Sequence, residues 1–242
     1  MAMPMLYLGD CHDILAAHPD KFNAVVCDPP YKMEIHVRGF AAKRCYYGNL
    51  DYGTSTSFEL SSAFYEMLLA HLTEINMVFF CNKLMKLDIE NWAVAQKFTF
   101  DELVLLKSSP VPLTNNQWLP DKEFAVHVFR DCKVKGNYQT KRTWFLGANY
   151  QQKEIDHPSV KPLSIVQHIV SNVSERGDTV CDPFMGSGTT GVAAIRLGRK
   201  FIGCEINEKF FDLSCQRIEN AYKQGDMFGA TDSDKAMQKP LF

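Results

Sequence analysis

The sequence has no long hydrophobic run, no closely spaced cysteine pair and little net charge. None of its apolar stretches approaches the roughly 18 residues that a membrane-spanning helix requires. Residues 1–10 lack the basic segment followed by an apolar stretch that marks a secretion signal. We therefore expect a protein that works in the cytoplasm and has no membrane partner.

The eight cysteines are scattered, and no two of them form a Cys-x-x-Cys pair. Cys27, Cys81, Cys181 and Cys204 lie inside or at the ends of apolar segments. Reduced cysteine in such positions behaves as a small buried hydrophobe, so we expect neither disulfides nor a metal site. The formal net charge is −2, so any contact with nucleic acid must come from local basic patches.

What the sequence does contain is an alternation of short β-rich apolar segments with helical patterns. A chain of 242 residues suffices for one α/β domain. The alternation predicts a mostly parallel sheet covered by helices on both faces. Strands are predicted at 5–8, 22–27, 76–81, 100–106, 123–129, 179–181 and 200–204, and helices at 59–72, 84–96, 162–174, 189–198 and 207–223.

Three polar, aromatic and loop-like stretches interrupt this alternation, at 32–57, 107–121 and 130–160. Long loops inside a compact domain are commonly functional, and these are too aromatic for plain disorder. The segment 224–242 is rich in Gly, Asp, Ser and Lys without periodicity. We therefore expect one domain over residues 1–223 and a flexible tail.

Two of the predicted strands end at the same dipeptide, Asp-Pro. Residues 26–31 read Val-Cys-Asp-Pro-Pro-Tyr, and residues 180–190 read Val-Cys-Asp-Pro-Phe-Met-Gly-Ser-Gly-Thr-Thr. Ligands of open α/β sheets bind just beyond the carboxyl ends of the strands. Asp28 and Asp182 would therefore face one crevice if the two strands are neighbours, with a cofactor at one junction and its substrate at the other.

The second junction has the pattern of a nucleotide site. Gly186 and Gly188 would let the backbone approach a ligand, and a helix starting near Thr189 presents unpaired N–H groups. Glu205 ends the next strand and could accept hydrogen bonds from ribose hydroxyls. Residues 186–191 also satisfy G-x-G-x-x-G, which leaves a nicotinamide-dependent oxidoreductase as an alternative. Because only a helix and a tail follow Glu205, the remaining strands must precede it, in a permuted order.

The first junction, Asp28-Pro29-Pro30-Tyr31, suits an exocyclic amine of a nucleobase. The lone pair of such a nitrogen is delocalised into the ring, which makes it a poor nucleophile. The Asp28 carboxylate and the Pro29 carbonyl could accept its two hydrogens and aim the lone pair at a methyl donor. Tyr31 offers a face on which an extruded base could stack. The plainer alternative is a tight turn held by the two prolines.

At these residues the sequence resembles the β class of DNA amino-methyltransferases, in which Asp-Pro-Pro-Tyr precedes Asp-Pro-Phe-x-Gly-Ser-Gly. The resemblance extends over most of residues 5–222. It implies a single Rossmann-like methyltransferase domain, S-adenosylmethionine as methyl donor and double-stranded DNA as substrate. It also implies direct methyl transfer to the N6 amine of a flipped-out adenine, in a restriction-modification setting. The cofactor residues implied by the likeness are Asp10, Cys11, Asp28, His157, Ser159, Lys161, Asp182, Pro183, Phe184, Gly186, Ser187, Gly188, Thr189, Glu205 and Ile206.

Some of these residues have a simpler alternative role. Asp10 could only cap the following helix, His157 could be a loop residue, and Lys161 could be a solvated charge before a helix that begins at Pro162. Ser159 stands where the family has threonine and keeps the hydroxyl. Cytosine N4, RNA and a protein amide also remain open as methyl acceptors.

The sequence departs from the family in having little room for a large DNA-recognition domain. Compact insertions at about 32–57 and 130–156 would have to serve, unless their charges are merely solvated. The first combines basic residues with four aromatics, and basic residues also lead the second. The predicted DNA contacts are Lys32, Arg38, Lys43, Arg44, Lys133, Lys135, Lys141 and Arg142. Residues 224–228 and 238–242 resemble peptides that dock on the DNA sliding clamp, and β-class likeness makes a homodimer plausible.

Overall fold

The computed structural model describes residues 2–30, 60–108, 110, 118–147 and 160–228. Strands and helices alternate along most of this part of the chain. The strands are β1 (Met5–Leu8), β2 (Ala24–Cys27), β3 (Ile75–Cys81), β4 (Thr99–Lys107), β5 (Lys122–Arg130), β6 (Trp144–Gly147), β7 (Thr179–Asp182) and β8 (Lys200–Glu205). The helices are α1 (Cys11–Ala17), α2 (Ser62–His71), α3 (Lys83–Ala95), α4 (Leu163–Val173), α5 (Thr189–Arg196) and α6 (Glu208–Phe228).

The strands form one sheet in the order β1-β8-β7-β2-β3-β5-β4-β6. Each neighbouring pair is parallel except those that involve β5, which runs against both β3 and β4. The predicted α/β class and mostly parallel sheet are therefore confirmed. In this order β2 and β7 are neighbours although about 150 residues separate them, with Val25 opposite Cys181.

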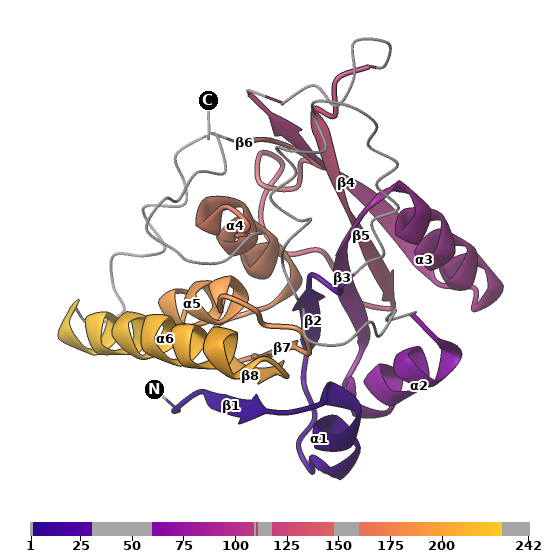
Figure 1. Ribbon diagram of the computed structural model, residues 1–242. Coiled ribbons are helices and arrows are strands. Elements are labelled where there is room, and N and C mark those ends of the chain that lie inside the picture. The colour runs from indigo at the N-terminus through magenta and orange to yellow at the C-terminus, as the bar shows by residue number, and fades with distance from the viewer. Residues whose placement is uncertain (1, 31–59, 109, 111–117, 148–159, 229–242) are drawn as a thin grey trace, which may run out of the picture.

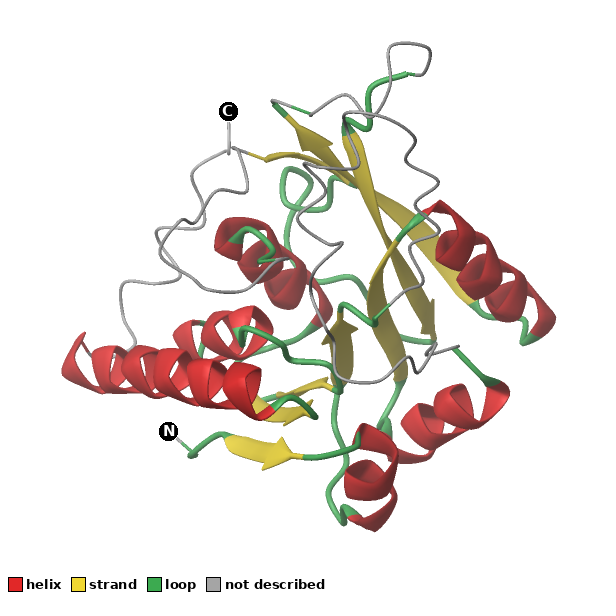
Figure 2. Cartoon of the chain, viewed as in Figure 1, coloured by secondary structure: helices red, strands yellow, loops and turns green. Residues whose placement is uncertain are grey.

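Helices cover both faces of the sheet, with α1, α2 and α3 on one side and α4, α5 and α6 on the other (Figures 1 and 2). Successive residues of a strand point to opposite faces, so a fully buried strand must be apolar at every position. In β2, Ala24 and Val26 join the cluster under α4 and α5, whereas Val25 and Cys27 join the cluster under α1 to α3. Strands that are apolar at every position are thus explained by the two cores, one on each face of the sheet.

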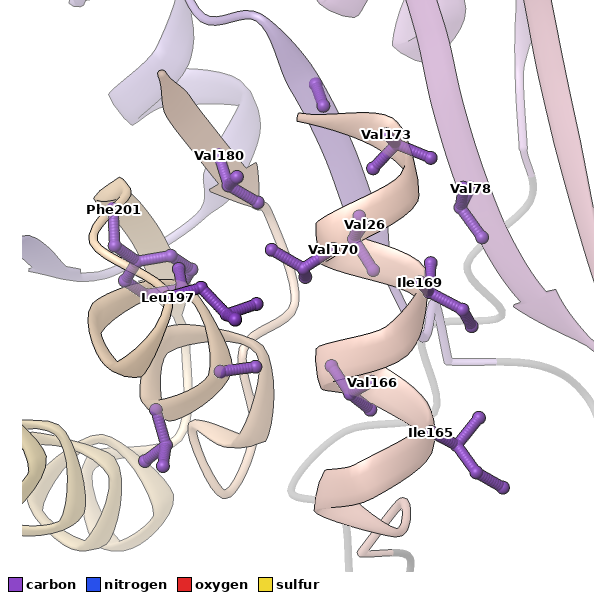
Figure 3. Close-up of a cluster of buried hydrophobic side chains, with 14 of the residues drawn as sticks. Val26, Val78, Ile165, Val166, Ile169, Val170, Val173, Val180, Leu197 and Phe201 are labelled. Atoms are coloured by element: carbon purple, nitrogen blue, oxygen red, sulfur yellow. The ribbon is translucent and has the colours of Figure 1, made fainter. Parts of the chain in front are cut away.

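The core beneath α4 and α5 is built mainly from aliphatic side chains (Figure 3). Ile165, Ile169 and Val173 recur on one face of α4 at helical spacing and are almost completely buried. Each such side chain contributes about 1.5–3 kcal/mol when it leaves water. The opposite core contains five of the cysteines, Cys11, Cys27, Cys81, Cys181 and Cys204. Burial raises the pKa of Cys11, Cys81 and Cys204 to about 12, so these thiols stay protonated.

Toward the amino ends of the parallel strands, a buried polar cluster joins four elements. His127 Nε2 lies 3.0 Å from Asn76 Oδ1 and donates to it. Asn76 Nδ2 donates to the carbonyl oxygens of Val173 at 2.7 Å and Asn23 at 3.2 Å. Asn23 Oδ1 in turn accepts from the N–H of Thr179 at 2.9 Å. These contacts tie β5, β3, α4 and β7 together without leaving those polar groups unpaired.

The predicted strands and helices are confirmed with end points that differ by a few residues, and three elements differ more. The four-residue β6 falls inside the predicted loop 130–160, where its alternation of exposed Trp144, buried Phe145 and exposed Leu146 is too short to stand out. The prediction omitted α1 as a helix. Helix α6 continues to Phe228, so the first five residues of the predicted tail 224–242 are helical. The described part has no helix both long and apolar enough to cross a bilayer.

Candidate active site

The two Asp-Pro junctions lie side by side at the carboxyl ends of β2 and β7. The neighbouring parallel strands bring Asp28, just beyond β2, next to Asp182, the last residue of β7. The charge of Asp28 is close enough to influence the ionisation of Asp182. The sequence-based expectation that the two aspartates share one edge of the sheet therefore agrees with the topology.

Asp182 is a buried carboxyl group with only 3% of its surface exposed. Its Oδ1 accepts the backbone N–H of Phe184 at 3.0 Å, which fixes the turn after the strand. Burial raises the pKa of Asp182 to about 7, and the nearby charges of Asp28 and Glu205 add to the increase, while hydrogen bonds from Thr190 and Phe184 oppose it. A positively charged group in contact would favour the ionised form.

Asp28 makes different contacts with its two oxygens. Its Oδ2 accepts a hydrogen bond of 2.7 Å from Lys161 Nζ, which precedes α4. Its Oδ1 is buried and has no hydrogen-bond partner among the described residues. A buried acceptor without a partner costs free energy, and such a cost is commonly retained where a ligand supplies the missing donor. Oδ1 is therefore suited to accept an N–H from a substrate.

Lys161 also lies near the negative charge of Glu123, a residue that was not among the predicted site residues. Glu123 Oε2 lies 3.8 Å from Lys161 Nζ, and Glu123 Oε1 lies 2.8 Å from Lys107 Nζ. Glu123 is near the start of β5 and reaches this edge because β5 runs against its neighbours. In the sequence, the only sign of this role was a charged pair at the start of an apolar strand. Such a pair does not reveal the direction in which the strand runs.

The turn between β7 and α5 has a backbone that requires glycine. Gly188 precedes α5 with φ of 76°, a left-handed conformation that side chains disfavour. A Cβ at this position would lie 2.9 Å from Cβ of Ser214. On the side where a Cβ would lie, the space beside Gly188 is filled by α6. Glycine at this position therefore lets α6 pack closely against the turn, and its predicted role in leaving room for a ligand stays a prediction.

Helix α6 also holds the turn through Arg217. This guanidinium donates to the carbonyl oxygen of Ser187 and lies 3.4 Å from Thr189 Oγ1. The hydroxyls of Ser187 and Thr189 are 3.2 Å apart, and both residues are buried. Burial lowers the pKa of Arg217 from its ordinary value. The sequence analysis missed Arg217, since nothing local in α6 shows that it reaches the turn.

Glu205 and Asp10 lie at the adjacent strand ends, where Leu8 of β1 is opposite Glu205 of β8. Glu205 Oε2 accepts from the N–H of Gly186 at 2.9 Å, and Oε1 accepts from the N–H of Asn207 at 2.8 Å. Burial raises the pKa of Glu205. Asp10 caps α1 by accepting the N–H of His12 at 2.8 Å. The capping alternative for Asp10 is therefore real, and it leaves the second carboxylate oxygen for another contact.

This edge of the sheet has the groups that an adenosyl cofactor needs. Glu205 retains lone pairs for ribose hydroxyls. Leu8, which is opposite Glu205 in the sheet, and Ile206, which follows it, have exposed apolar side chains that suit a purine ring. Asp182 is a buried carboxylate for a cationic group. Of the remaining predicted cofactor residues, Cys11 and Pro183 are buried and Phe184 is half-buried, with its ring centroid 5.5 Å from that of Phe64.

Several predicted site residues lie outside the described residues. They are Tyr31, His157 and Ser159 among the predicted catalytic and cofactor residues, and Lys32, Arg38, Lys43 and Arg44 among the predicted DNA contacts. The four other predicted DNA contacts are described. Because β5 runs antiparallel, the chain after Arg130 starts at the amino-end edge of the sheet, away from Asp28.

The structure therefore does not bring Lys133 and Lys135 to the Asp28 edge. Lys133 is exposed there, and Lys135 pairs with Glu175 at 3.2 Å. Lys141 and Arg142 are exposed further along, just before β6, and the Arg142 guanidinium lies 5.6 Å from the ring centroid of Trp144. Of the four described residues, only Lys141 and Arg142 precede a strand that runs toward the edge where Asp28 lies.

Part of the chain matches a known family. The sequence model of a family described as DNA methylase, of the N6 and N4 type, matches residues 115–216. Over this segment the chain is similar to the DNA amino-methyltransferases. It is 36% identical over 101 residues to the type II methyltransferase M2.MboI of Moraxella bovis, a match covering 38% of this chain and 37% of that protein.

A second amino-methyltransferase relative is the DNA adenine methyltransferase YhdJ of Escherichia coli K12. The identity is 41% over 90 residues, which covers 37% of this chain and 29% of YhdJ. The matched part thus spans 37% of the length of M2.MboI and 29% of the length of YhdJ. Sequence likeness to these methyltransferases is therefore local, while likeness of structure is more extensive.

Two solved methyltransferase structures share the fold over most of the chain. The complex of M1.HpyAVI with its SAM ligand superposes with a TM-score of 0.68 at 24% identity, covering 89% of this chain and 100% of that one. The PvuII cytosine-N4-specific DNA methyltransferase gives a TM-score of 0.68 at 14% identity, covering 93% of both chains. These likenesses establish that the chain has the Rossmann-like fold of these two structures, one of which is named as cytosine-N4-specific.

Proposed function

We propose that the protein is a DNA methyltransferase that transfers the methyl group of S-adenosylmethionine to the N6 amine of a flipped-out adenine. The observation that carries this proposal is the pairing of Asp28 with the cofactor-type turn after Asp182 on neighbouring strands. One junction offers a buried acceptor without a partner, and the other offers the groups that suit an adenosyl ligand. Methyl donor and acceptor would therefore meet at one edge of the sheet.

The residues of the first junction orient the amine. Asp28 Oδ1 and the Pro29 carbonyl oxygen accept its two hydrogens, so that the nitrogen lone pair turns out of the ring plane. Pro29 is buried and its φ is fixed by the ring, which keeps the carbonyl in place. Tyr31 provides the stacking face for the base. S-adenosylmethionine would supply a methyl group on a positively charged sulfur, which would leave as the neutral thioether, and Asp28 would receive the proton that the methylated nitrogen loses. No covalent enzyme intermediate is required.

The residues of the second edge hold the methyl donor. Asp182 would hold its cationic methionine portion, Glu205 would hold its ribose, and Leu8 and Ile206 would contact its adenine ring. Asp10 takes the adenine amino group with the oxygen that does not cap α1. Carboxylates at these positions favour a cationic ligand, which suits the sulfonium.

Adenine is favoured over cytosine because the relative from Escherichia coli is named as an adenine methyltransferase. Cytosine N4 is the second candidate, since the fold is shared with a cytosine-N4-specific enzyme and the same two acceptors suit either amine. We further place the reaction in the cytoplasm and in a restriction-modification setting. A homodimer and docking of residues 224–242 on the sliding clamp remain predictions.

The deciding experiment uses the full chain, S-adenosylmethionine with an isotopically labelled methyl group, and double-stranded DNA. The DNA is digested to nucleosides and examined by mass spectrometry, with RNA and bulk protein as parallel acceptors. We expect label in N6-methyldeoxyadenosine. Label in N4-methyldeoxycytidine would establish the second candidate, and label only in RNA or protein would overturn both. Modification-sensitive sequencing of DNA from expressing cells would then give the target sequence.

A further inference from the structure

The contact between Lys161 and Asp28 gives the lysine a role that the resemblance did not assign. The resemblance placed Lys161 at the methionine end of the cofactor. In the structure its Nζ donates to Asp28 Oδ2 at 2.7 Å, across 133 positions of sequence. Only 9% of the lysine side chain is exposed. A lysine so far from water needs acceptors for its charge, and the catalytic carboxylate is one of them.

A second carboxylate and an aromatic ring also lie near the ammonium of Lys161. Glu123 Oε2 lies 3.8 Å from Nζ, and the ring centroid of Phe80 lies 5.4 Å from it. Glu123 is held in turn by Lys107 at 2.8 Å. Charges therefore alternate from Asp28 through Lys161 and Glu123 to Lys107, which joins the ends of β2, β5 and β4. An ammonium held in this way has little freedom to move relative to the sheet.

We propose that Lys161 is the positioning residue for Asp28 in the methyl transfer proposed above, on which this inference rests. A carboxylate has two equivalent oxygens and rotates about its Cβ–Cγ bond. Lys161 takes Oδ2, and Oδ1 is left as the oxygen that accepts from the amine. The lysine does not touch the reacting atoms. It fixes which oxygen meets the substrate, and in which direction.

The size of the effect follows from the geometry. A displacement of a reacting group by about 1 Å costs roughly 10²-fold in rate. Without Lys161 the Asp28 carboxylate is free to rotate, so the loss falls on the transfer step and not on cofactor affinity. Arginine retains both the charge and the donors, and therefore restores part of the rate.

The test compares Lys161→Met, Lys161→Arg and a matched control, Lys86→Met. Lys86 pairs with Glu90 at 3.0 Å and lies 5.7 Å from the ring centroid of Phe124, so it has a similar environment without a contact to Asp28. Single-turnover rates are measured at saturating DNA and S-adenosylmethionine, and cofactor dissociation constants by calorimetry. We expect Lys161→Met to lower the rate about 10²-fold and to change the dissociation constant less than about threefold. Lys161→Arg should regain at least about tenfold, and Lys86→Met should match the wild type.

Epistasis distinguishes positioning from a separate role. Because Lys161 acts through Asp28, adding Lys161→Met to Asp28→Ala should cause no further loss of rate. The opposite pattern, weaker cofactor binding with an unchanged saturated rate, would assign Lys161 to the cofactor and overturn the proposal. Equal losses in Lys161→Met and Lys86→Met would also overturn it.

A stability measurement keeps the proposal separate from the proposed function. Removing Lys161 leaves the carboxylate of Asp28 without its counter-charge, so Asp28→Asn should raise the urea midpoint of the Lys161→Met variant. If the wild type methylates no DNA, the proposed function fails while this measurement still tests the pair. A double variant no more stable than Lys161→Met alone would show that the pair does not form.

Discussion

The two ends of the sheet both contain a cluster of buried polar groups, and the two clusters differ in how these groups are paired. At the amino end, His127, Asn76 and Asn23 form a chain of hydrogen bonds to one another and to backbone groups. At the carboxyl end, Asp28 Oδ1 has no partner among the described residues and Asp182 is buried as a carboxyl group. The comparison suggests that the first end maintains the fold, whereas the second is incomplete without ligands.

The largest expected effect is on turnover, at the carboxyl end. Asp28→Ala removes the acceptor that orients the amine, so the single-turnover rate should fall about 10³-fold, equivalent to about 4 kcal/mol. Cofactor binding should remain, because Asp182 and Glu205 are unchanged. Rates from labelled methyl incorporation and affinities from calorimetry check both parts. A variant that still methylates DNA at the wild-type rate would remove Asp28 from the catalytic role.

The second prediction concerns the pH dependence of stability at the same end. The pKa of Asp182 rises from 3.8 to about 7 on folding, so the folded state retains a proton that the unfolded state has lost between these values. The contribution of this group is present at acid pH and disappears as pH rises through about 7, a loss of about 4 kcal/mol. Urea unfolding without cofactor from pH 4 to 8 measures it against Asp182→Asn, which does not titrate. If the free energies of unfolding of the two proteins changed with pH in the same way, the prediction that Asp182 is a buried carboxylate without a counter-charge would be contradicted.

The third prediction has the opposite sign and belongs to the amino end. Burial lowers the pKa of His127 from 6.5 to about 4, so between these values only the unfolded state carries the extra proton. The stability contribution of His127 is therefore full above pH 6.5 and is lost as pH falls toward 4, by about 3 kcal/mol. His127→Gln keeps a donor for Asn76 and removes the titration, so it serves as the reference in the same unfolding series. Turnover at neutral pH should not change.

The smallest expected effect compares one glycine from each end. Gly188 and Gly177 both have left-handed backbones, with φ of 76° and 91°. A Cβ at Gly177 meets nothing within 4 Å, so Gly177→Ala should cost only the strain of about 1–2 kcal/mol. Gly188→Ala adds the close approach to Ser214 and should cost more, and it should also weaken cofactor binding. Thermal unfolding and calorimetry check this, and equal costs at the two positions would show that α6 does not brace the turn.

Much of the fold was predictable because its signals are local. Strands that are buried on both faces are continuous apolar segments, so they can be recognised in the sequence whatever their order in the sheet. The helices between them can be recognised from the helical spacing of their apolar residues. The two Asp-Pro junctions were recognisable for the same reason, since their residues are consecutive in sequence. The short edge strand β6 and the last turn of α6 were missed because four residues of alternation, or a glycine near a helix end, carry little information.

By itself the sequence determined the α/β class, the position of the main elements and the two junctions at which chemistry was expected. Only the tertiary structure decided that β5 runs against its neighbours, which brings Glu123 to Lys161 and takes Lys133 and Lys135 to the other edge. It also decided that Lys161 holds Asp28 and that α6 fills the space beside Gly188. Strand order and direction depend on pairing between distant segments and on the burial of both faces of the sheet, which a local pattern does not encode.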